Sequence, residues 1–369
     1  MSDFPVFGPR AEPARVFKAD GSCLIVLMRH LGDVVIASGI INALREQFPG
    51  LVVDILGKPE LKEVATAFSQ YREFIEIEVP CFGHHRKGAT AMKASIRTLR
   101  QIRRREYDFC INTIGDIREN MIGRVTGAHW NIAPVWERGH LFKRKMTDRG
   151  ASWMTNKPIM IPSRYSSYYE SMDFFARQLG LPGLVFKTPS SLPRTTGNRL
   201  TVALHPGASH PSRHWPEEKW RRLVSELVAR GCIIKILGAA KESQALFAAF
   251  GKEAAGQELE ILTGNVSHFV SCLATADVLV GMDSFSVHAA YALGIPAVVL
   301  NGSADPAILT PPRDTAVSAG HLCRYYPCYY SYPCQRRENE YVCVRGIEVS
   351  TVLSVLNATM ARVQLTDAT

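Results

Sequence analysis

Short apolar runs that alternate with helix-like stretches constrain the fold of this chain more than any other feature. Residues 23–29 (CLIVLMR) and 51–56 (LVVDIL) are nearly continuous apolar runs, typical of strands buried on both faces of a parallel sheet. A helical pattern at residues 34–47 lies between them and stops near Phe48-Pro49-Gly50. This order of strand, helix and strand predicts a parallel α/β architecture.

The same alternation continues through both halves of the chain. In the first half we expect strands at residues 74–78 and 109–112, a strongly basic helix at 89–105, an irregular basic surface loop with some short structure at 130–162 and a helix at 165–179. Residues 181–199 are rich in Pro, Ser, Thr and Gly, as linkers are. In the second half we expect strands at 200–204, 232–237, 259–262, 276–282 and 296–300, and helices at 216–230, 241–252, 268–275 and 284–293.

Two α/β regions joined by a linker predict two Rossmann-like domains that face a cleft, each built on a doubly wound parallel sheet. The chain has 369 residues, which is long for one core and natural for two domains. We place the first domain at 22–185 and the second at 186–348. An amphipathic helix within 349–369 is expected to pack back across the domains. Ligands of such sheets bind at the carboxyl ends of the strands.

The charge balance favours an acidic partner. The formal net charge is +9, which suits a nucleotide, a phosphorylated glycan, an anionic membrane surface or nucleic acid. An inert basic surface is the alternative. No apolar run approaches the roughly 18–20 residues that span a bilayer. The N-terminal stretch carries several charged side chains, unlike a signal peptide. We therefore expect a cytoplasmic protein.

Three strand ends gather polar residues, and the first of them is "RHLGDVV" at residues 29–35. Gly32 makes a turn there and Asp33 begins a helix. Asp33 suits the start of a helix as a capping residue with a favourable charge. Alternatively, its carboxylate faces the expected cleft and accepts a proton from an acceptor hydroxyl.

The second strand end is "HPGASHPSRHW" at residues 205–215. The backbone N–H groups of Gly207, Ala208 and Ser209 suit a phosphate cradle. The planar fork of Arg213 suits the charge of a departing diphosphate. A surface loop with a solvated arginine is the alternative.

The third strand end is "MDSFSVH" at residues 282–288. Asp283 and Ser284 precede a helix whose unpaired N–H groups favour an anion. Asp283 is alternatively a helix cap, and His288 a packed core histidine. A Ser/His/Asp hydrolase is disfavoured because no G-x-S-x-G elbow is present.

Glu242 follows the expected strand at residues 232–237 and suits a ribose hydroxyl, although an exposed glutamate at a helix start is equally consistent. No G-x-G-x-x-G motif follows the first strand of either half, and G-x-x-x-x-G-K-[ST] is absent. These absences disfavour a nicotinamide or flavin enzyme and a P-loop NTPase.

Together, four stretches of the chain resemble the ADP-heptose:lipopolysaccharide heptosyltransferases, the ninth glycosyltransferase family. In chain order they are GDVVIASGIINALREQFPG, ALHPGASHPSRHWPEEKW, ILGAAKE and DVLVGMDSFSVHAAYALGIPAVVLNGSADP. The resemblance implies the GT-B fold, with the acceptor bound by the first domain and the nucleotide sugar by the second. It also implies inverting transfer that needs no cofactor or catalytic metal.

The resemblance also assigns residues. Asp33 matches the proposed catalytic base, and Arg213 falls where the family has a cation near the phosphates. At the position of Phe285 the family usually has Gly. The donor site then comprises His205, Gly207, Ala208, Ser209, Glu242, Asp283, Ser284, Phe285, Ser286 and His288.

The resemblance implies transfer of a heptose from ADP-heptose to a saccharide hydroxyl of lipopolysaccharide core or a related glycan. The implied partners are this nucleotide sugar, an acidic acceptor and the surface of the inner membrane, with no nucleic acid. Two alternatives are transfer to protein Ser hydroxyls, as in the autotransporter type, and a non-catalytic nucleotide-sugar-binding protein. Arg118 and Arg124 are either acceptor contacts or solvated side chains.

Four cysteines cluster near the C-terminus, at Cys323, Cys328, Cys334 and Cys343. Their spacing lacks the C-x-x-C pairs of common zinc sites. The cluster loosely resembles the iron-holding cysteine finger of autotransporter-modifying heptosyltransferases. A structural iron or zinc site, reduced thiols and disulfides are the three alternatives.

Overall fold

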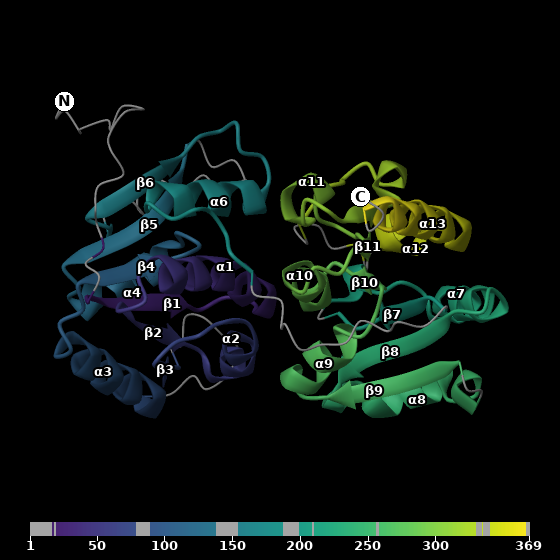
Figure 1. Cartoon of the computed structure of the whole chain (residues 1–369), viewed down its shortest axis with the longest axis horizontal. Helices are drawn as coiled ribbons and strands as arrows, with labels where there is room; N and C mark the ends of the chain where they lie inside the picture. Colours follow the sequence, from purple (N-terminus) through teal and green to yellow (C-terminus); the bar gives the residue numbers. More distant parts are fainter. Residues whose placement is uncertain are drawn as a thin grey trace. The chain divides into compact units, whose positions relative to one another are not determined.

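The computed structural model describes residues 17, 20–78, 89–137, 154–186, 199–208, 210–255, 258–329, 334 and 340–366. These residues form two compact units (Figure 1). The first unit comprises Met1–Arg29, Ala37–Lys62 and Ser69–Val185, and the second comprises His30–Ile36, Glu63–Phe68 and Phe186–Thr369. Within the described part, no helix combines the length and the apolar character needed to cross a bilayer.

The first unit is built on a six-stranded sheet in the order β3-β2-β1-β4-β5-β6, and all neighbouring strands are parallel. This is the order of a Rossmann fold. Its strands are β1 (Ser22–Leu27), β2 (Val52–Gly57), β3 (Glu73–Glu76), β4 (Phe109–Asn112), β5 (Trp130–Trp136) and β6 (Lys157–Ile161). The helices that connect these strands are α1 (Leu31–Gln47), α2 (Lys62–Phe68), α3 (Ala89–Arg103), α4 (Ile117–Thr126) and α6 (Tyr168–Gln178), with a short 3-10 helix η1 (Pro59–Leu61). By their contacts, the start of α1 and nearly all of α2 group with the second unit.

Alternating side chains of β1 divide the core of the first unit between the two faces of the sheet. Leu24 and Val26 share one apolar cluster with Ile102 of α3 and Ile122 of α4. These two helices therefore cover the same face of the sheet. The intervening residues of β1, among them Ile25, are equally buried. Burial on both faces explains why β1 is nearly continuously apolar.

The second unit repeats this architecture with the strand order β12-β11-β10-β7-β8-β9, again parallel throughout. Its strands are β7 (Thr201–His205), β8 (Ile233–Ala239), β9 (Leu259–Gly264), β10 (Val278–Met282), β11 (Ala297–Leu300) and β12 (Thr315–Val317). The α-helices are α7 (Glu217–Ala229), α8 (Ser243–Phe250), α9 (Val266–Leu273), α10 (Phe285–Ala292), α11 (Pro306–Leu309), α12 (Val342–Arg345) and α13 (Val349–Thr366). Short 3-10 helices are η3 (Pro211–Arg213), η4 (Ala240–Glu242), η5 (Glu253–Ala255) and η6 (Gly320–Leu322).

The C-terminal helix α13 packs within the second unit. Val352 and Leu356 belong to the same apolar cluster as Leu204, Val280 and Leu300 of the central strands. The Trp215 indole N–H, which lies just before α7, donates to the carbonyl of Ile347 at 3.0 Å. These contacts fasten the C-terminal segment to the second sheet.

The surface loop with some short structure expected at residues 130–162 is wrong in part, because two strands of the sheet, β5 and β6, lie within it; residues 138–153 lie outside the described part of the chain. Pro134 in β5 and Pro158 in β6 disfavour strands in the sequence. Both are tolerated here. β4 pairs with β5 only as far as Ile132, so Pro134 lies beyond that ladder. β6 is the edge strand of the sheet, where a missing N–H costs little.

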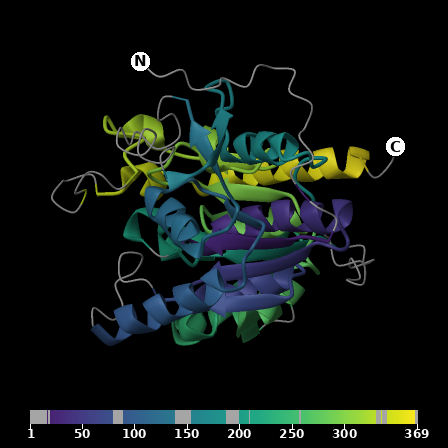
Figure 2. The ribbon, with the colours of Figure 1, turned by 90° about the vertical axis from the view of Figure 1, so that its left-hand side faces the viewer.

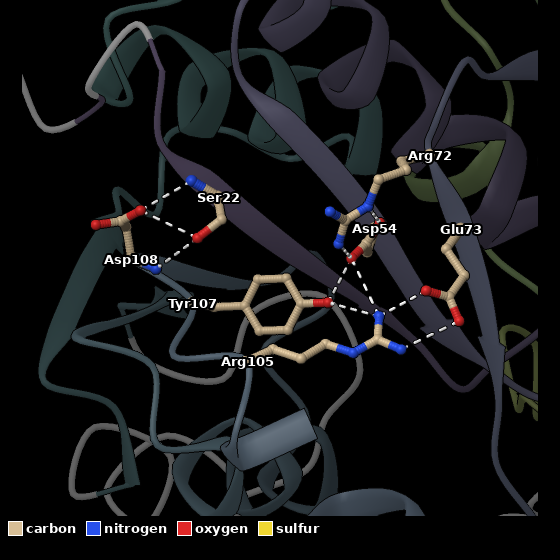
Figure 3. A network of polar contacts seen from close by, with 7 residues as sticks. All are labelled: Ser22, Asp54, Arg72, Glu73, Arg105, Tyr107 and Asp108. Carbon is tan, nitrogen blue, oxygen red and sulfur yellow. Dashed lines mark hydrogen bonds and ion pairs between the residues drawn. The ribbon is translucent and has the colours of Figure 1, made fainter. Parts of the chain in front are cut away.

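A polar network lies at the amino-terminal edge of the first sheet, where β1, β3 and β4 begin (Figure 3). Its centre is Asp54 of β2, which is fully buried. Asp54 accepts hydrogen bonds from the Tyr107 hydroxyl and from Arg72, whose Nε lies 3.0 Å from Asp54 Oδ1. Arg105 lies 3.6 Å from the same carboxylate and forms two bonds to Glu73, at 2.6 and 3.2 Å. Burial and the bond to Asp54 raise the pKa of Tyr107.

Beside this network, Ser22 and Asp108 join the starts of β1 and β4. The Ser22 backbone N–H and hydroxyl both donate to Asp108 Oδ2, at 2.8 and 3.0 Å (Figure 3). The edge at which the strands begin is therefore cross-linked by charges and hydrogen bonds. Ligands of such sheets bind at the opposite edge, where the strands have their carboxyl ends.

Candidate functional site

The two central strands of the second sheet, β7 and β10, meet where the strand order reverses. Gly281 of β10 pairs with His205 at the end of β7, so the two carboxyl ends are level. Asp283 and Ser284 follow β10, and the turn at Gly207 follows β7. Ligands of doubly wound sheets bind at this switch point. The second and third polar strand ends expected from sequence are thus brought together.

His205 is largely buried at this edge. Burial lowers its pKa to about 4, against an opposing contribution from the charge of Glu242. The imidazole is therefore neutral near pH 7 and can both donate and accept a hydrogen bond. Its Nδ1 lies 3.4 Å from the Ser284 hydroxyl, and the ring contacts Phe269 edge-on with centroids 5.2 Å apart.

Glu242 lies beside the turn that follows β7. Its Oε2 accepts the Ala239 backbone N–H at 2.7 Å, which folds the side chain back over the start of η4. A Cβ atom added at Gly207 would lie 2.9 Å from Glu242 Oε1 and 3.0 Å from His205 Nε2. A side chain at this position would therefore force Glu242 or His205 to shift.

We expect Gly207→Ala to weaken ADP binding by about tenfold, or ~1.4 kcal/mol. The added methyl group would displace Glu242 or His205 and disturb the turn between them. Titration calorimetry with ADP measures the effect, and the thermal unfolding midpoint shows whether the fold is retained. Wild-type affinity in a well-folded variant would contradict the placement of this turn in a nucleotide site.

Arg213 is held against the turn that follows β10. Its Nη1 donates to the backbone carbonyl of Asp283 at 2.8 Å, and its Nε lies 3.8 Å from Asp283 Oδ2. Asp283 is only 6% exposed, so the attraction between its carboxylate and Arg213 is stronger than it would be at an open surface. The structure therefore joins two residues that are 70 positions apart in the sequence.

The start of α10 supplies backbone N–H groups to the same edge. Ser284 occupies the N-cap position, but its side chain makes no capping hydrogen bond. Its hydroxyl instead lies 3.1 Å from that of buried Ser286. A helix N-terminus whose cap side chain turns aside suits an anion.

Phe285 packs sideways at this helix start. Its ring lies 5.6 Å from Phe269, which in turn contacts His205, so the three rings form a continuous aromatic wall. His288 follows one turn later in α10. Burial lowers the pKa of His288, and the charge of Asp283 opposes the shift.

Ala208 and Ser209 are the two remaining donor-site candidates in the turn that follows β7. The carbonyl of Ala208 lies 2.9 Å from Nε2 of His214, which fixes the turn. Ser209 lies outside the described residues.

Asp33 lies in the first turn of α1, within the segment His30–Ile36 that groups with the second unit. Its Oδ2 accepts the backbone N–H of His30 at 3.0 Å. This bond is one half of a capping box, with Asp33 as the third residue of the helix rather than the N-cap that the sequence suggested. A second carboxylate oxygen leaves acceptor capacity for a further proton or hydrogen bond.

The switch point of the first sheet, between β1 and β4, carries a charge cluster that includes the predicted Arg118 and two residues that sequence reasoning missed, Arg29 and Asp116. Asp116, the N-cap of α4, accepts from Arg29 at 3.0 Å and from Arg118 at 2.9 and 3.1 Å. Burial alone would raise the pKa of Asp116, but the bonds from Arg118 and the charge of Arg29 hold it below its usual value. Arg124 is exposed two turns along α4 and is not brought to this cluster.

A family model described as glycosyltransferase family 9 (heptosyltransferase) matches residues 95–343, more than half of the chain. The chain belongs to glycosyltransferase family 9. The family 9 transferase is 20% identical over 293 residues to lipopolysaccharide heptosyltransferase 3 of Escherichia coli, covering 75% of this chain and 82% of that protein.

Two solved structures are similar to the family 9 transferase along most of its length. E. coli heptosyltransferase WaaC with ADP-2-deoxy-2-fluoro heptose gives a TM-score of 0.66 at 20% identity, covering 83% of this chain and 96% of that one. The iron-containing heptosyltransferase TibC of E. coli, in complex with ADP-D-beta-D-heptose, gives 0.54 at 13% identity, covering 94% and 77%. At these identities the likeness shows the fold, and it confirms the expected GT-B α/β class.

The four clustered cysteines of the transferase are neighbours in the structure. Burial raises the pKa of the Cys343 thiol to about 12, and proximity to Cys323, Cys328 and Cys334 adds to the shift. All four are free cysteines rather than disulfide partners. In the described part of the chain, no group of His, Cys, Asp or Glu side chains has the arrangement of a metal site.

Asn301 is a further residue that sequence reasoning missed. It follows β11, next to the turn at Asp283, whose backbone N–H donates to the carbonyl of Leu300 at 3.2 Å. Asn301 is fully buried, and its side-chain nitrogen and oxygen have no hydrogen-bond partner among the described residues. The sequence signal that could have identified Asn301 is the polar Asn-Gly-Ser stretch at the end of an apolar strand.

Proposed function

We propose that this glycosyltransferase moves a heptose, with inversion, from ADP-heptose to a saccharide hydroxyl of lipopolysaccharide core or a related glycan. The observation that carries the proposal is the convergence of His205, Glu242, Arg213 and Asp283 with the start of α10 at one switch point. This set combines an acid for a ribose, a cation for a diphosphate and a helix N-terminus for an anion.

Each donor-side group has a proposed role. Glu242 accepts a hydrogen bond from a ribose hydroxyl, as an acidic residue after the second strand of a Rossmann unit commonly does. Arg213 and the N–H groups at Ser284 and beyond offset the charge that grows on the departing diphosphate. Asp283 is directed toward the heptose, and the bond from Arg213 to its carbonyl fixes that turn.

The transfer step requires a base. Asp33, which groups by its contacts with the unit that holds the donor-side residues, takes the proton of the acceptor hydroxyl. The acceptor oxygen forms a bond to the anomeric carbon from the face opposite the diphosphate. The bond between that carbon and the diphosphate oxygen breaks, and ADP leaves with the electron pair. Attack from the opposite face inverts the anomeric configuration. The step uses groups of this chain alone.

The acceptor is proposed to bind the first unit near Arg29 and Arg118. These two partly exposed arginines flank Asp116 and offer cationic side chains to an acidic acceptor. Such an acceptor is an amphiphile, and we infer that the enzyme works from the cytoplasmic side of the inner membrane.

An acceptor screen with ADP-heptose as the fixed donor tests the proposal. We expect ADP release that depends on a core saccharide acceptor, with the opposite anomeric configuration in the product. Donor binding without turnover on any acceptor would support a non-catalytic nucleotide-sugar-binding protein instead. Turnover on a protein, with a heptose found on Ser, would move the acceptor class to the autotransporter type.

The cysteine grouping favours a second candidate feature, a structural iron or zinc ion. Four thiols are ligands that both metals accept, and a cation would reverse the raised pKa of Cys343 by stabilising the thiolate. As described, the side chains do not have the arrangement of a bound site. Binding would therefore require the cysteines to rearrange, and no step of the transfer depends on it.

We expect Cys343→Ser to remove the metal if one is held, and to lower the thermal unfolding midpoint. Elemental analysis and native mass spectrometry of wild type and variant measure both effects. Cys232→Ser, a buried cysteine far from the cluster in sequence, is the control. Reduced thiols at all four clustered positions and no bound metal in the wild type would establish the reduced alternative.

A further inference from the structure

The outer sides of α3 and α4 form a positively charged surface with apolar side chains set into it. On α3 and just beyond it, Lys93, Arg97, Arg100, Arg103 and Arg104 are all exposed. Their spacing of three or four residues places them in one stripe along the helix. The opposite stripe, which includes Ser95 and Ile102, is buried against the sheet.

Three large apolar side chains interrupt this charge. Ile96 lies within the α3 stripe and is 41% exposed, while Met121 and Val125 of α4 are 49% and 44% exposed. They account for three of the seven large apolar side chains that are exposed in the described part of the chain. Met121 and Val125 are four residues apart and share one side of α4 with Arg124.

The two helices adjoin, so their stripes form one surface. A Cβ atom at Gly127, the C-cap of α4, would lie 3.2 Å from Cγ of Arg103 on α3. Both helices cover the same face of the sheet, through Ile102 and Ile122. Figure 2 shows α3, in blue, on the near side of the first unit.

The positive charge of this surface is not neutralised within the described part of the protein. No ion pair there includes Lys93, Arg97, Arg100 or Arg124. In contrast, Arg105 turns inward to Glu73 and Asp54. α3 has no acidic residue along its whole length, and the nearest acid that follows it is Glu106.

We propose that this α3–α4 surface, defined by the cationic stripe of α3 and by Met121, Arg124 and Val125 of α4, binds an anionic phospholipid bilayer. Clustered cations are attracted to anionic headgroups, and scattered apolar side chains insert at the headgroup boundary. A soluble polyanion would satisfy the arginines and leave the apolar side chains in water. The bilayer is the occupant that satisfies both. The inference rests on the surface itself and needs no assumption about donor or acceptor.

Flotation of the full chain with vesicles tests the proposal. We expect it to float with vesicles that contain phosphatidylglycerol, to remain behind with vesicles of phosphatidylcholine alone, and to lose binding as salt rises. Arg97→Glu with Arg100→Glu is expected to weaken binding on the order of 100-fold. Ile96→Ser, Met121→Ser and Val125→Ser together are expected to weaken it roughly tenfold at unchanged charge.

A matched control reverses the same amount of charge elsewhere. Arg222→Glu with Lys252→Glu alters two exposed cations of the second unit and is expected to keep most of the binding. Thermal unfolding of each variant shows that the fold is retained. The proposal is overturned if wild type does not float with anionic vesicles, or if both α3–α4 variants float as wild type does. ADP-heptose turnover on a soluble acceptor, measured in parallel, is independent of either result.

Discussion

Asp33→Asn is expected to lower the rate of heptose transfer by ~10²–10⁴-fold, the usual contribution of a general base. The amide cannot take the acceptor proton. It can still accept the His30 backbone N–H that Asp33 binds at 3.0 Å, so the start of α1 keeps its hydrogen bond. ADP-heptose affinity should stay close to wild type, because the donor-side groups are untouched. Steady-state kinetics with a core saccharide acceptor, together with calorimetric donor binding, measures both quantities.

Asp33→Ala is the companion variant, because it removes the base and the capping bond together. We expect the same loss of rate as for Asn, plus a destabilisation of about 0.5–2 kcal/mol from the lost cap. If the Asn variant were as active as wild type while the Ala variant was not, Asp33 would be a structural cap and the base would lie elsewhere.

Asp54→Ala is expected to produce the largest loss of stability, about 2–4 kcal/mol in the free energy of unfolding. The substitution leaves the buried Tyr107 hydroxyl without its acceptor, and it removes the partner of Arg72 (Figure 3). This loss of stability is smaller than the full cost of breaking a buried ion pair, because Arg72 is 55% exposed and can be solvated. Urea denaturation of the variant and wild type measures the difference.

Glu73→Ala is the matched control at the same edge of the sheet. Glu73 pairs with Arg105 at 2.6 Å but is 46% exposed, so its loss is expected to cost at most about 1 kcal/mol. At a temperature where the variants are folded, both should retain the transfer rate of wild type. A stability change for Asp54→Ala no larger than that for Glu73→Ala would show that the buried carboxylate is not the centre of the network.

The helices and strands that the sequence predicts well are those whose burial is uniform. β1, β7 and β10 are buried along nearly their whole length, and their apolar runs are unmistakable. β6 alternates between partly buried and exposed residues at the edge of its sheet, and β5 contains Pro134 beyond the end of β4. Single-residue patterns cannot show that a neighbouring strand has ended. These two strands were therefore missed.

The candidate donor site was predictable for a related reason. Strand ends are visible in sequence, and parallel strands bring their carboxyl ends to one edge, so the turns at Gly207 and Asp283 were expected at the same edge of the second sheet. That their two strands are neighbours is given by the structure. The specific bond between Arg213 and the Asp283 carbonyl was not predictable, because it joins two loops. Arg29 and Asp116 were missed because an arginine after a strand and an aspartate before a helix are individually ordinary.

The Asp54 network also bears on how this transferase can be altered. It ties down the edge of the first sheet at which the strands begin, while the proposed acceptor contacts sit at the other end of the same strands. Substitutions that change the preferred acceptor can therefore be made without loosening the cross-links that hold the strands. Laboratory evolution of new acceptor preferences should accordingly tolerate many changes around Arg29 and Arg118, and very few around Asp54.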